Sequence, residues 1–145
     1  IESNKQVDKE LVIRYIQAAT LMPSWQFSRA IWKDETIKNI ILSMNKIRKS
    51  FNDVLEKAIK KCAENGTPII KPMIYFNDSI DDLNQFMLGD SIFVSPILKK
   101  NQFEKEITLP QGKWEYGYDH QIYEGKVVVK TPLEVLPYFI KKGEL

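Results

Sequence analysis

Two short apolar segments decide how this chain folds: they read Gly66-Thr67-Pro68-Ile69-Ile70-Lys71-Pro72 and Gln85-Phe86-Met87-Leu88-Gly89-Asp90-Ser91-Ile92-Phe93-Val94-Ser95-Pro96. The first predicts the end of a helix at Gly66, because glycine takes a positive φ without strain, and then a short buried strand between two prolines. The second predicts an apolar turn at Gly89 and another short buried strand. A helical part of the chain is therefore expected before Gly66, and strands after it.

The residues before Gly66 show helical periodicity in two places. The first helix is predicted to begin at Asp8, whose carboxylate can accept the free N–H groups of the first turn, and to end at Pro23. Its predicted buried face contains Leu11, Val12, Tyr15, Ile16 and Ala19. A second, longer helical region is predicted from Asp34 onward, with a bend near residues 50–53, where short polar side chains compete for backbone hydrogen bonds.

The pattern of apolar residues changes after Gly66. Residues 69–75 are almost continuously apolar, as expected for a strand buried on both faces of a parallel sheet. From about Phe103 onward, short alternating segments are separated by turn signals, which predicts an antiparallel sheet. The predicted fold class is therefore α+β, with helices and a parallel strand in residues 1–90 and only strands in residues 91–145.

Composition excludes several classes of function. The 21 Lys and Arg residues are scattered among 19 Asp and Glu residues, and the net charge of +2 is too small to indicate a nucleic-acid partner. No run approaches the ~20 apolar residues of a membrane-spanning helix, so no membrane segment is predicted. Hydrophobic residues make up 43% of the chain, enough for a sizeable core, and the single Cys62 is expected to pack as a small apolar side chain.

Large side chains are concentrated between the two helical regions, in residues 21–33. They are Met22, Trp25, Phe27 and Trp32. This composition is unusual for a solvated connection, so we expect the loop either to be packed under another part of the molecule or to line a site.

Five motifs in one order and spacing resemble glycoside hydrolase family 31. Besides the two opening segments, they are Leu11–Ser28, Leu109-Pro110-Gln111-Gly112-Lys113-Trp114 and Val135-Leu136-Pro137-Tyr138-Phe139-Ile140-Lys141-Lys142-Gly143. The resemblance implies that residues 1–90 are the C-terminal helices and last strand of a (β/α)8 catalytic barrel, and that residues 91–145 are the antiparallel β-sandwich that follows it. It also implies a carbohydrate substrate and, as a partner of this chain, the remainder of the parent barrel.

The loop beyond the first helix extends the resemblance toward a substrate. In many family members it ends in an Arg-Asn-His-like triplet whose histidine hydrogen-bonds the sugar next to the scissile bond, whereas this chain has Gln26, Phe27 and Ser28. The Met-Pro-x-x-Gln-Phe-Ser form is similar to a branch that includes the animal myogenesis-regulating glycosidase, for which an α-galactoside preference is known. The predicted substrate-binding residues are Trp25, Gln26 and Ser28, which offer a stacking face, an amide and a hydroxyl.

The catalytic carboxylates are expected outside this chain. The members that it resembles are retaining hydrolases, in which an aspartate attacks the anomeric carbon and a second carboxyl about 5 Å away protonates the leaving oxygen. Both carboxyls lie on earlier barrel strands in that family, and no residue here matches either, so no catalytic residue is assigned and the chain alone is predicted to be inactive. The implied chemistry needs no cofactor and no metal.

Other polar and aromatic candidates have structural interpretations. The adjacent Asp81 and Asp82 point apart on a predicted loop, and Asp90 is expected to bind backbone N–H groups in the turn after Gly89. His120 lies in a polar hairpin segment without a second metal ligand. Aromatic residues that can stack on sugars, but are expected to serve mainly cross-strand packing, are Trp114, Tyr116, Tyr118 and Tyr123.

Two other classes of function stay open at this point. One is a catalytically silent relative that binds a glycan or a protein, and the other is a self-standing α+β domain with a structural role. A silent relative differs from an enzyme in lacking the two catalytic carboxylates in the sequence that precedes this chain in the parent protein. A self-standing domain differs from a barrel remnant in its surface, because a remnant leaves a parallel strand edge unpaired and an apolar helix face uncovered. We expect a remnant, and we expect it to be poorly soluble or oligomeric.

Overall fold

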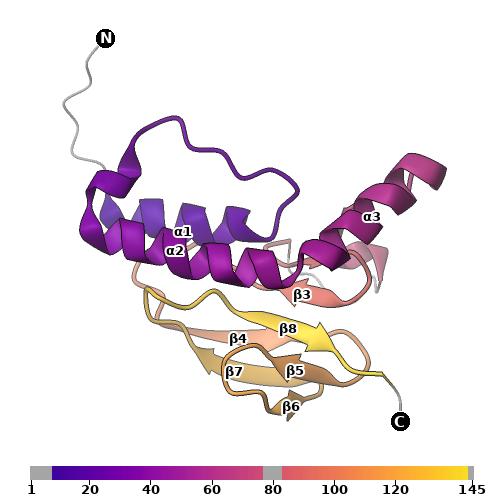
Figure 1. The fold of residues 1–145 in the computed structure, drawn as a ribbon. Helices are drawn as coiled ribbons and strands as arrows, with labels where there is room; N and C mark the ends of the chain where they lie inside the picture. Colours follow the sequence, from indigo (N-terminus) through magenta and orange to yellow (C-terminus); the bar gives the residue numbers. More distant parts are fainter. Residues whose placement is uncertain (1–7, 77–82, 144–145) are drawn as a thin grey trace.

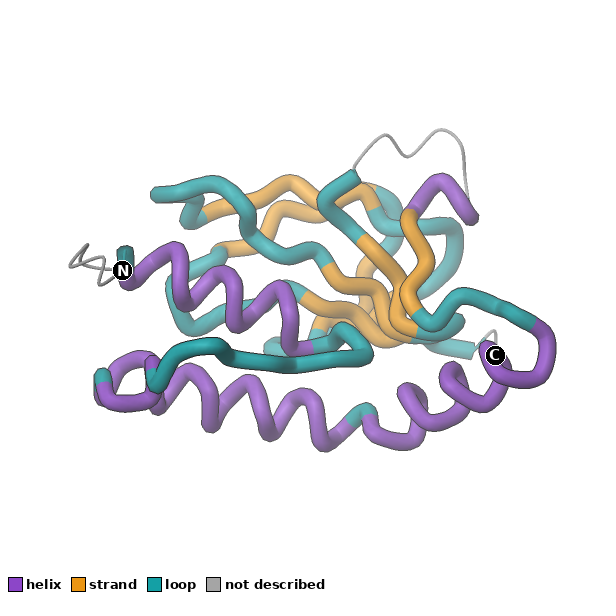
Figure 2. The backbone as a smooth tube through the Cα atoms, turned by 90° about the horizontal axis from the view of Figure 1, so that it is seen from above, coloured by secondary structure: helices purple, strands orange, loops and turns teal. Residues whose placement is uncertain are grey.

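The computed structural model describes residues 8–76 and 83–143, and its helices form one layer on one side of the strands (Figure 1). The helices are α1 (Lys9–Thr20), the 3₁₀ helix η1 (Ile31–Lys33), α2 (Glu35–Ser50) and α3 (Asn52–Asn65). Seen from above, α1 lies beside α2, and α3 continues from the end of α2 (Figure 2). No helix in the described ranges is long and apolar enough to cross a membrane.

The starts of α1 and α2 and the end of α3 confirm the sequence prediction, whereas α1 ends at Thr20, before the predicted Pro23. The Asp8 carboxylate accepts a hydrogen bond from the N–H three residues later at 3.2 Å, and the Asp34 carboxylate does the same for α2 at 3.1 Å. Gly66 follows α3 in the left-handed conformation, with a φ of 74°. The bend predicted near residues 50–53 occurs at Phe51, which separates α2 from α3.

The strands form two antiparallel sheets. In order of pairing, the six-stranded sheet contains β1 (Ile70–Pro72), β2 (Phe86–Leu88), β3 (Ile92–Val94), β8 (Tyr138–Lys141), β5 (Trp114–Tyr116) and β6 (Ile122–Tyr123). The second sheet contains β4 (Glu104–Thr108) and β7 (Lys126–Lys130). The antiparallel sheet predicted after Phe103 is thus confirmed. Strands β2 and β3 pair with each other, and the turn between them contains residues 90 and 91, between which the sequence analysis predicts the domain boundary.

The parallel strand predicted in residues 69–75 is wrong for this structure. Only Ile70–Pro72 form a strand, and β1 pairs antiparallel with β2, with Ile70 opposite Leu88. The chain continues as the 3₁₀ helix η2 (Met73–Tyr75), and Ile74 is 61% exposed. The strand is short because Pro72 has no N–H group with which to extend the ladder.

The six-stranded sheet separates two apolar cores, because alternate residues of a strand point to opposite faces. In β3, Ile92 and Val94 pack toward the helices, whereas Phe93 packs toward the two-stranded sheet. The buried residues of the helix-side core are Ile13, Ile16, Leu21, Ile37, Ile40, Met44, Phe51, Phe86, Leu88, Ile92, Val94, Leu136 and Tyr138. Those of the strand-side core are Met73, Met87, Phe93, Ile107, Leu109, Trp114, Tyr116, Val127, Val129 and Phe139.

The buried face of α1 differs from the predicted one. Ile16 and Ala19 are buried as expected, but Leu11 is 66% exposed and Tyr15 is 55% exposed. Arg14, by contrast, is only 5% exposed. The helix is therefore rotated so that a charged residue, and not the predicted leucine and tyrosine, faces the strands.

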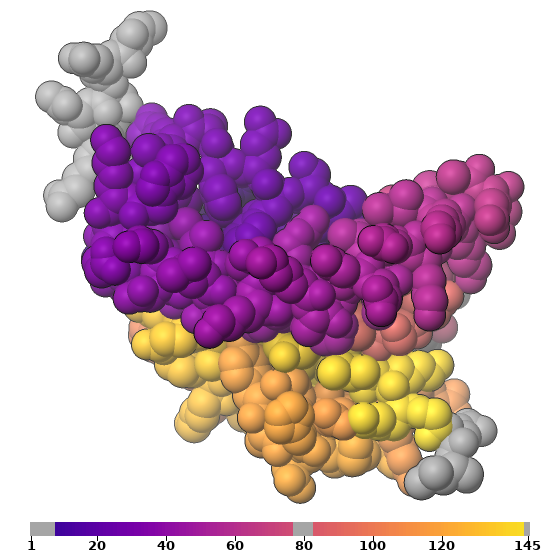
Figure 3. All heavy atoms as spheres, viewed as in Figure 1, coloured from indigo at the N-terminus to yellow at the C-terminus, as the bar shows by residue number. Residues whose placement is uncertain are grey.

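A hydrogen-bond network explains this rotation. The Arg14 guanidinium donates to the backbone carbonyls of Gln102, Thr131, Pro132 and Val135. Gln17 accepts a further bond from Arg14 at 3.0 Å and donates to the Leu133 carbonyl at 2.6 Å. Most of these carbonyls belong to the segment between β7 and β8, which is not paired in a sheet. Buried carbonyls require donors, so Arg14 and Gln17 fix α1 on the strands. On the face shown in Figure 3, the helical residues and the strand residues meet along one continuous boundary.

Candidate functional site

The loop between α1 and α2, residues 21–30, passes over the outer side of these helices, away from the strands (Figures 1 and 2). Arg48 of α2 holds its beginning by donating to the carbonyls of Thr20, Met22 and Pro23, at 2.7, 2.6 and 3.0 Å. Further on, the Tyr15 hydroxyl donates to the Gln26 carbonyl at 3.3 Å. These bonds engage the backbone of the α1–α2 loop, so they fix its path without using its side chains.

Side chains of this loop alternate between two environments. Trp25 and Phe27 are half-buried and border the helix-side core, and their rings meet edge to face with centroids 5.3 Å apart. Gln26 and Ser28 are exposed. Such alternation is what an extended segment produces when one side rests on a core. Of the four large side chains in residues 21–33, which are expected either to pack or to line a site, Trp25 and Phe27 pack against the core, whereas Met22 and Trp32 are exposed.

Trp25 has one further feature. Its Nε1 atom is buried and has no hydrogen-bond partner among the described residues. Indole N–H groups are normally satisfied when they are buried, so Trp25 is an exception among the described residues.

The three predicted substrate-binding residues therefore lie on one loop, where Gln26 and Ser28 expose an amide and a hydroxyl and Trp25 is half-buried against the helix-side core. Such groups can bind hydroxyl groups of a ligand. The loop contains no carboxylate, so it can supply neither a nucleophile nor a general acid of the glycosidase type.

Asp90 has different partners from those predicted. Its carboxylate binds the Nζ atom of Lys71 and, at 3.1 Å, that of Lys61, and it accepts from no backbone N–H group of residues 8–76 and 83–143. Lys71 is only 3% exposed, and a buried ammonium group requires a counter-charge. Hydrogen bonding to Lys71, supported by Lys61, holds the pKa of Asp90 below its ordinary value. Asp81 and Asp82 lie outside the described residues.

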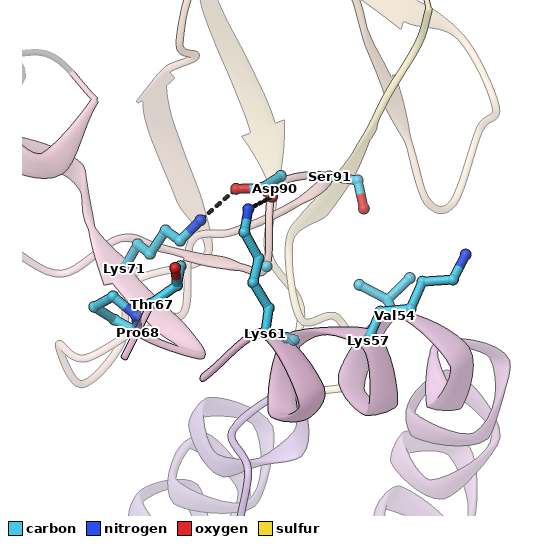
Figure 4. A pocket seen from close by; sticks show the side chains of 10 residues that line it. Val54, Lys57, Lys61, Thr67, Pro68, Lys71, Asp90 and Ser91 are labelled. Carbon is cyan, nitrogen blue, oxygen red and sulfur yellow. Dashed lines mark hydrogen bonds and ion pairs between the residues drawn. The ribbon is translucent and has the colours of Figure 1, made fainter. Parts of the chain in front are cut away.

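A pocket of about 220 Å³ lies beside this ion pair (Figure 4). Figure 4 shows Lys61 of α3 and Lys71 of β1 reaching Asp90 from different elements. With two ammonium groups on one carboxylate, Asp90 is held in its ionised form and is a poor general acid. The ion pair joins α3, β1 and the turn after β2, so its role is structural.

The histidine and the metal-ligand candidates also have structural roles. His120 lies in the turn after β5 with a φ of 58°, and its Nδ1 is 3.1 Å from Glu115 Oε1. Its side chain is 73% exposed, as predicted for a surface turn. Residues 8–76 and 83–143 contain no group of three or more His, Cys, Asp or Glu side chains that could hold a metal ion.

The aromatic residues of the strands divide between core and surface. Trp114 is 1% exposed and Tyr116 is 7% exposed, which confirms the packing role predicted for them. Trp114 Nε1 donates to the Pro110 carbonyl at 2.9 Å and closes the turn before β5. Tyr118 is 39% exposed and Tyr123 is half-buried, so these two rings reach the surface.

Sequence periodicity did not identify Arg14 and Arg48, which fix α1 and the α1–α2 loop. Both donate to backbone carbonyls of distant segments, and such partners leave no residue-type signal in a sequence. Charged residues commonly stand between apolar ones in an amphipathic helix and lie on its exposed face, so the position of Arg14 beside Ile13 does not mark it as buried. Arg48 has no sequence signal either.

Comparison with known proteins confirms the resemblance. The glycosyl hydrolase family 31 C-terminal domain matches residues 66–145. The myogenesis-regulating glycosidase of Mus musculus is 27% identical over 144 residues, which are 95% of this chain and 19% of that protein. An alpha-glucosidase of Saccharolobus solfataricus is 25% identical over 148 residues, which cover 94% of this chain and 21% of that protein.

A solved structure shares the whole fold. A GH31 sulfoquinovosidase from E. rectale has a TM-score of 0.86 at 18% identity, and the match covers 99% of this chain and 24% of that one. The chain thus spans about a fifth of the length of the curated relatives that it matches. Because the family domain accounts for more than half of its residues, the chain belongs to glycoside hydrolase family 31.

Proposed function

We propose that this chain is the C-terminal part of a longer retaining α-glycosidase that hydrolyses O-glycosidic bonds. The match of residues 66–145 to the family's C-terminal domain carries the proposal. The curated relatives are about five times as long as the stretch that they share with this chain, which leaves room in such a protein for catalytic carboxylates outside it. No catalytic residue is assigned within the chain.

In this proposal, residues 1–90 complete a (β/α)8 barrel and residues 91–145 form the sandwich that follows. Strand β1 ends the six-stranded sheet, so one of its edges has no neighbour among the described residues. Large apolar side chains are exposed on the helices and on η1: Leu11, Tyr15, Trp32, Leu42 and Ile59. An open strand edge and exposed apolar side chains are what a missing part of a barrel would cover. The remainder of the barrel is the partner that fits both.

The reaction needs two carboxyl groups about 5 Å apart, one to attack the anomeric carbon and one to protonate the departing oxygen. Water then releases the sugar from the covalent intermediate, and the second carboxylate takes the proton of that water. The residues of this chain act on the sugar and not on the reacting atoms. Gln26 and Ser28, which are exposed, would bind hydroxyl groups and so orient the sugar for attack, and the part of the Trp25 ring that the core leaves uncovered would stack on the sugar.

A panel of nitrophenyl α-glycosides tests the proposal, with the full-length protein as the enzyme and this chain alone as the control. The panel includes α-galactoside, α-glucoside and α-xyloside, since the loop lacks the histidine that many family members use for glucosides. Hydrolysis by the full-length protein alone would support the proposal and identify the sugar. If the folded full-length protein binds a glycan but hydrolyses no member of the panel, it is a catalytically silent relative.

The α1–α2 loop can be tested in the same assay. We expect Gln26→Ala and Ser28→Ala each to lower kcat/KM by about three- to tenfold, the value of one hydrogen bond to an uncharged ligand group. Asn39→Ala and Ser43→Ala, which remove the same groups from exposed positions of α2, are the matched controls. If both loop variants keep the KM and kcat of the wild type, the loop does not bind the substrate.

A further inference from the structure

A second candidate site lies on the other side of the molecule. A cleft of about 300 Å³ separates the β5–β6 hairpin from β7, and its lining includes Tyr118, Asp119, Tyr123, Val128, Lys130 and Pro132. The α1–α2 loop lies beyond the helices, whereas β5, β6 and β7 lie on the opposite side of the molecule (Figure 1). The volume is at the lower end of the range of small-molecule sites, which is about 300 to 1,000 Å³.

The carboxylate in this cleft is held in a fixed orientation. One oxygen of Asp119 accepts the Gln121 N–H at 2.9 Å, and the other accepts the Tyr123 hydroxyl at 2.6 Å. The Tyr123 hydroxyl donates this bond, and Asp119 in turn raises the pKa of Tyr123. Each carboxylate oxygen has a further lone pair. Two neighbouring hydroxyl groups of a ligand can therefore donate to Asp119.

The tyrosine rings provide apolar surface beside that carboxylate. Tyr118 is partly exposed, and its hydroxyl oxygen accepts the Leu136 N–H at 3.0 Å, which fixes the ring. Burial raises the pKa of Tyr118 to about 12, as expected for a hydroxyl held against the backbone. Val128, which is 57% exposed, and Pro132 extend the apolar surface. Rigid aromatic faces with one polar end suit molecules that present C–H groups and hydroxyl groups together.

The charges of the lining select among possible ligands. Lys130 is paired with Glu104 of β4, so its charge is compensated there and Asp119 gives the lining a negative charge. A negative lining disfavours anionic ligands. An uncharged polyol that has a C–H face and neighbouring hydroxyl groups fits the oriented carboxylate, the apolar surface of the rings and the charge of the lining.

We propose that this cleft is a binding site for a neutral saccharide, separate from the site of hydrolysis. The inference rests on the proposed function only for the class of ligand, because a protein that acts on glycosides encounters saccharides. Asp119 and Lys130 bind hydroxyl groups, Tyr118 stacks on the sugar ring, and Tyr123 is a positioning residue that orients Asp119.

The test uses the full-length protein labelled with 3-fluorotyrosine, whose ¹⁹F signals for Tyr118 and Tyr123 are assigned with Tyr118→Phe and Tyr123→Phe. Maltotriose, isomaltotriose and an α-galactotriose are titrated as neutral probes, and glucuronate is titrated as the anionic control. We expect at least one neutral probe to shift both signals and glucuronate to shift neither. Asp119→Asn should weaken that binding about tenfold, the value of a hydrogen bond to a charged group. Lys126→Ala, an exposed change on β7 outside the cleft, should leave the affinity unchanged.

The results also separate this inference from the proposed function. If the cleft signals shift with a neutral probe while nitrophenyl glycosides are not hydrolysed, the cleft proposal stands and the hydrolase proposal fails. If the glycosides are hydrolysed but no neutral probe moves the Tyr118 and Tyr123 signals, the cleft is not a saccharide site. Equal affinity of Asp119→Asn and the wild type for the neutral probe would also overturn the cleft proposal. Tyr123→Phe keeps the ring and removes the bond to Asp119, so a weaker affinity with an unchanged Tm indicates positioning and not stability.

Discussion

The two cores on either side of the six-stranded sheet differ in how completely they are closed. Within the described residues, twelve partly buried apolar side chains border the helix-side core, whereas Tyr123 alone borders the strand-side core. The strand-side core also contains ring contacts at its centre, where Phe93 lies 6.0 Å from Trp114 and 5.9 Å from Phe139 between centroids. Two sheets facing each other thus enclose their interior within this chain, while one layer of helices leaves its interior bordered by half-covered side chains.

This difference indicates where each part of the chain obtains its stability. The free energy gained by burying apolar surface is roughly proportional to the area removed from water, about 25 cal/mol per Å². A side chain at an open border gains only part of that amount until another surface covers it. The strand-side core is therefore expected to be stable within this chain, and the helix-side core to gain stability from the proposed remainder of the barrel.

The largest expected effect compares two phenylalanines, one in each core. Phe93 is 0% exposed at the centre of the strand-side core, and Phe51 is 9% exposed between α2 and α3. We expect Phe93→Ala to lower the free energy of unfolding by about 3–5 kcal/mol, because the closed core cannot collapse around the cavity. Phe51→Ala should lower the free energy of unfolding by a smaller amount. Urea denaturation of both variants measures the difference, and equal losses would contradict the contrast between the cores.

The next effect concerns the contact between the two regions. Arg14→Met is expected to lower the free energy of unfolding by about 2–3 kcal/mol, since it leaves buried carbonyls between β7 and β8 without a donor. Hydrogen exchange in α1 should increase more than in β3 and β8, because Arg14 ties the helix to the strands. Lys38→Met on the exposed side of α2 is the control and should change stability by less than about 0.5 kcal/mol. Uniform loss of protection would mean that Arg14 stabilises the whole fold equally.

A smaller effect is expected where two backbone segments of the sheet approach closely. A Cβ atom on Gly117 would overlap the ring of Tyr138, whose hydroxyl donates to the Gly117 carbonyl at 3.2 Å. Gly117→Ala should therefore cost about 1–3 kcal/mol through displacement of that ring. Combining it with Tyr138→Leu should cost less than the sum of the two single changes. Thermal unfolding of the single and double variants gives the coupling, and strict additivity would show that the ring is not the obstacle.

The helix ends that the sequence predicts correctly have local causes. Asp8, Asp34 and Gly66 mark helix ends through contacts with their own neighbours in the chain, and their roles are confirmed. The predictions that failed depend on distant partners. The parallel strand expected in residues 69–75 pairs antiparallel with β2 instead, and Asp90 binds two lysines in place of nearby N–H groups.

The same distinction applies to the α1–α2 loop. The large side chains in residues 21–33 predict a loop that either packs against the molecule or lines a site, because bulky aromatic residues are unfavourable in water. Its exact path depends on Arg48 and Tyr15, which bind its carbonyls from two helices. No property of the loop sequence specifies those donors. The role of Trp25, Gln26 and Ser28 in substrate binding stays a prediction.

The smallest expected effect concerns the ion pair that joins α3 to the sheet. Because Lys71 and Lys61 lower the pKa of Asp90 in the folded state, the carboxylate stabilises the fold above its unfolded pKa of about 3.9. That contribution should be lost as the pH falls through the lower pKa that Asp90 has in the folded state. Asp90→Asn should therefore be less stable than the wild type at pH 7, and the difference should shrink below about pH 4.

Lys71→Met/Asp90→Asn removes both charges and should recover part of the loss at pH 7, since no buried ammonium group is left without a counter-charge. Urea midpoints from pH 3 to pH 7 measure these differences, and a constant gap between Asp90→Asn and the wild type over that range would show that the pair does not stabilise the contact between α3 and β1.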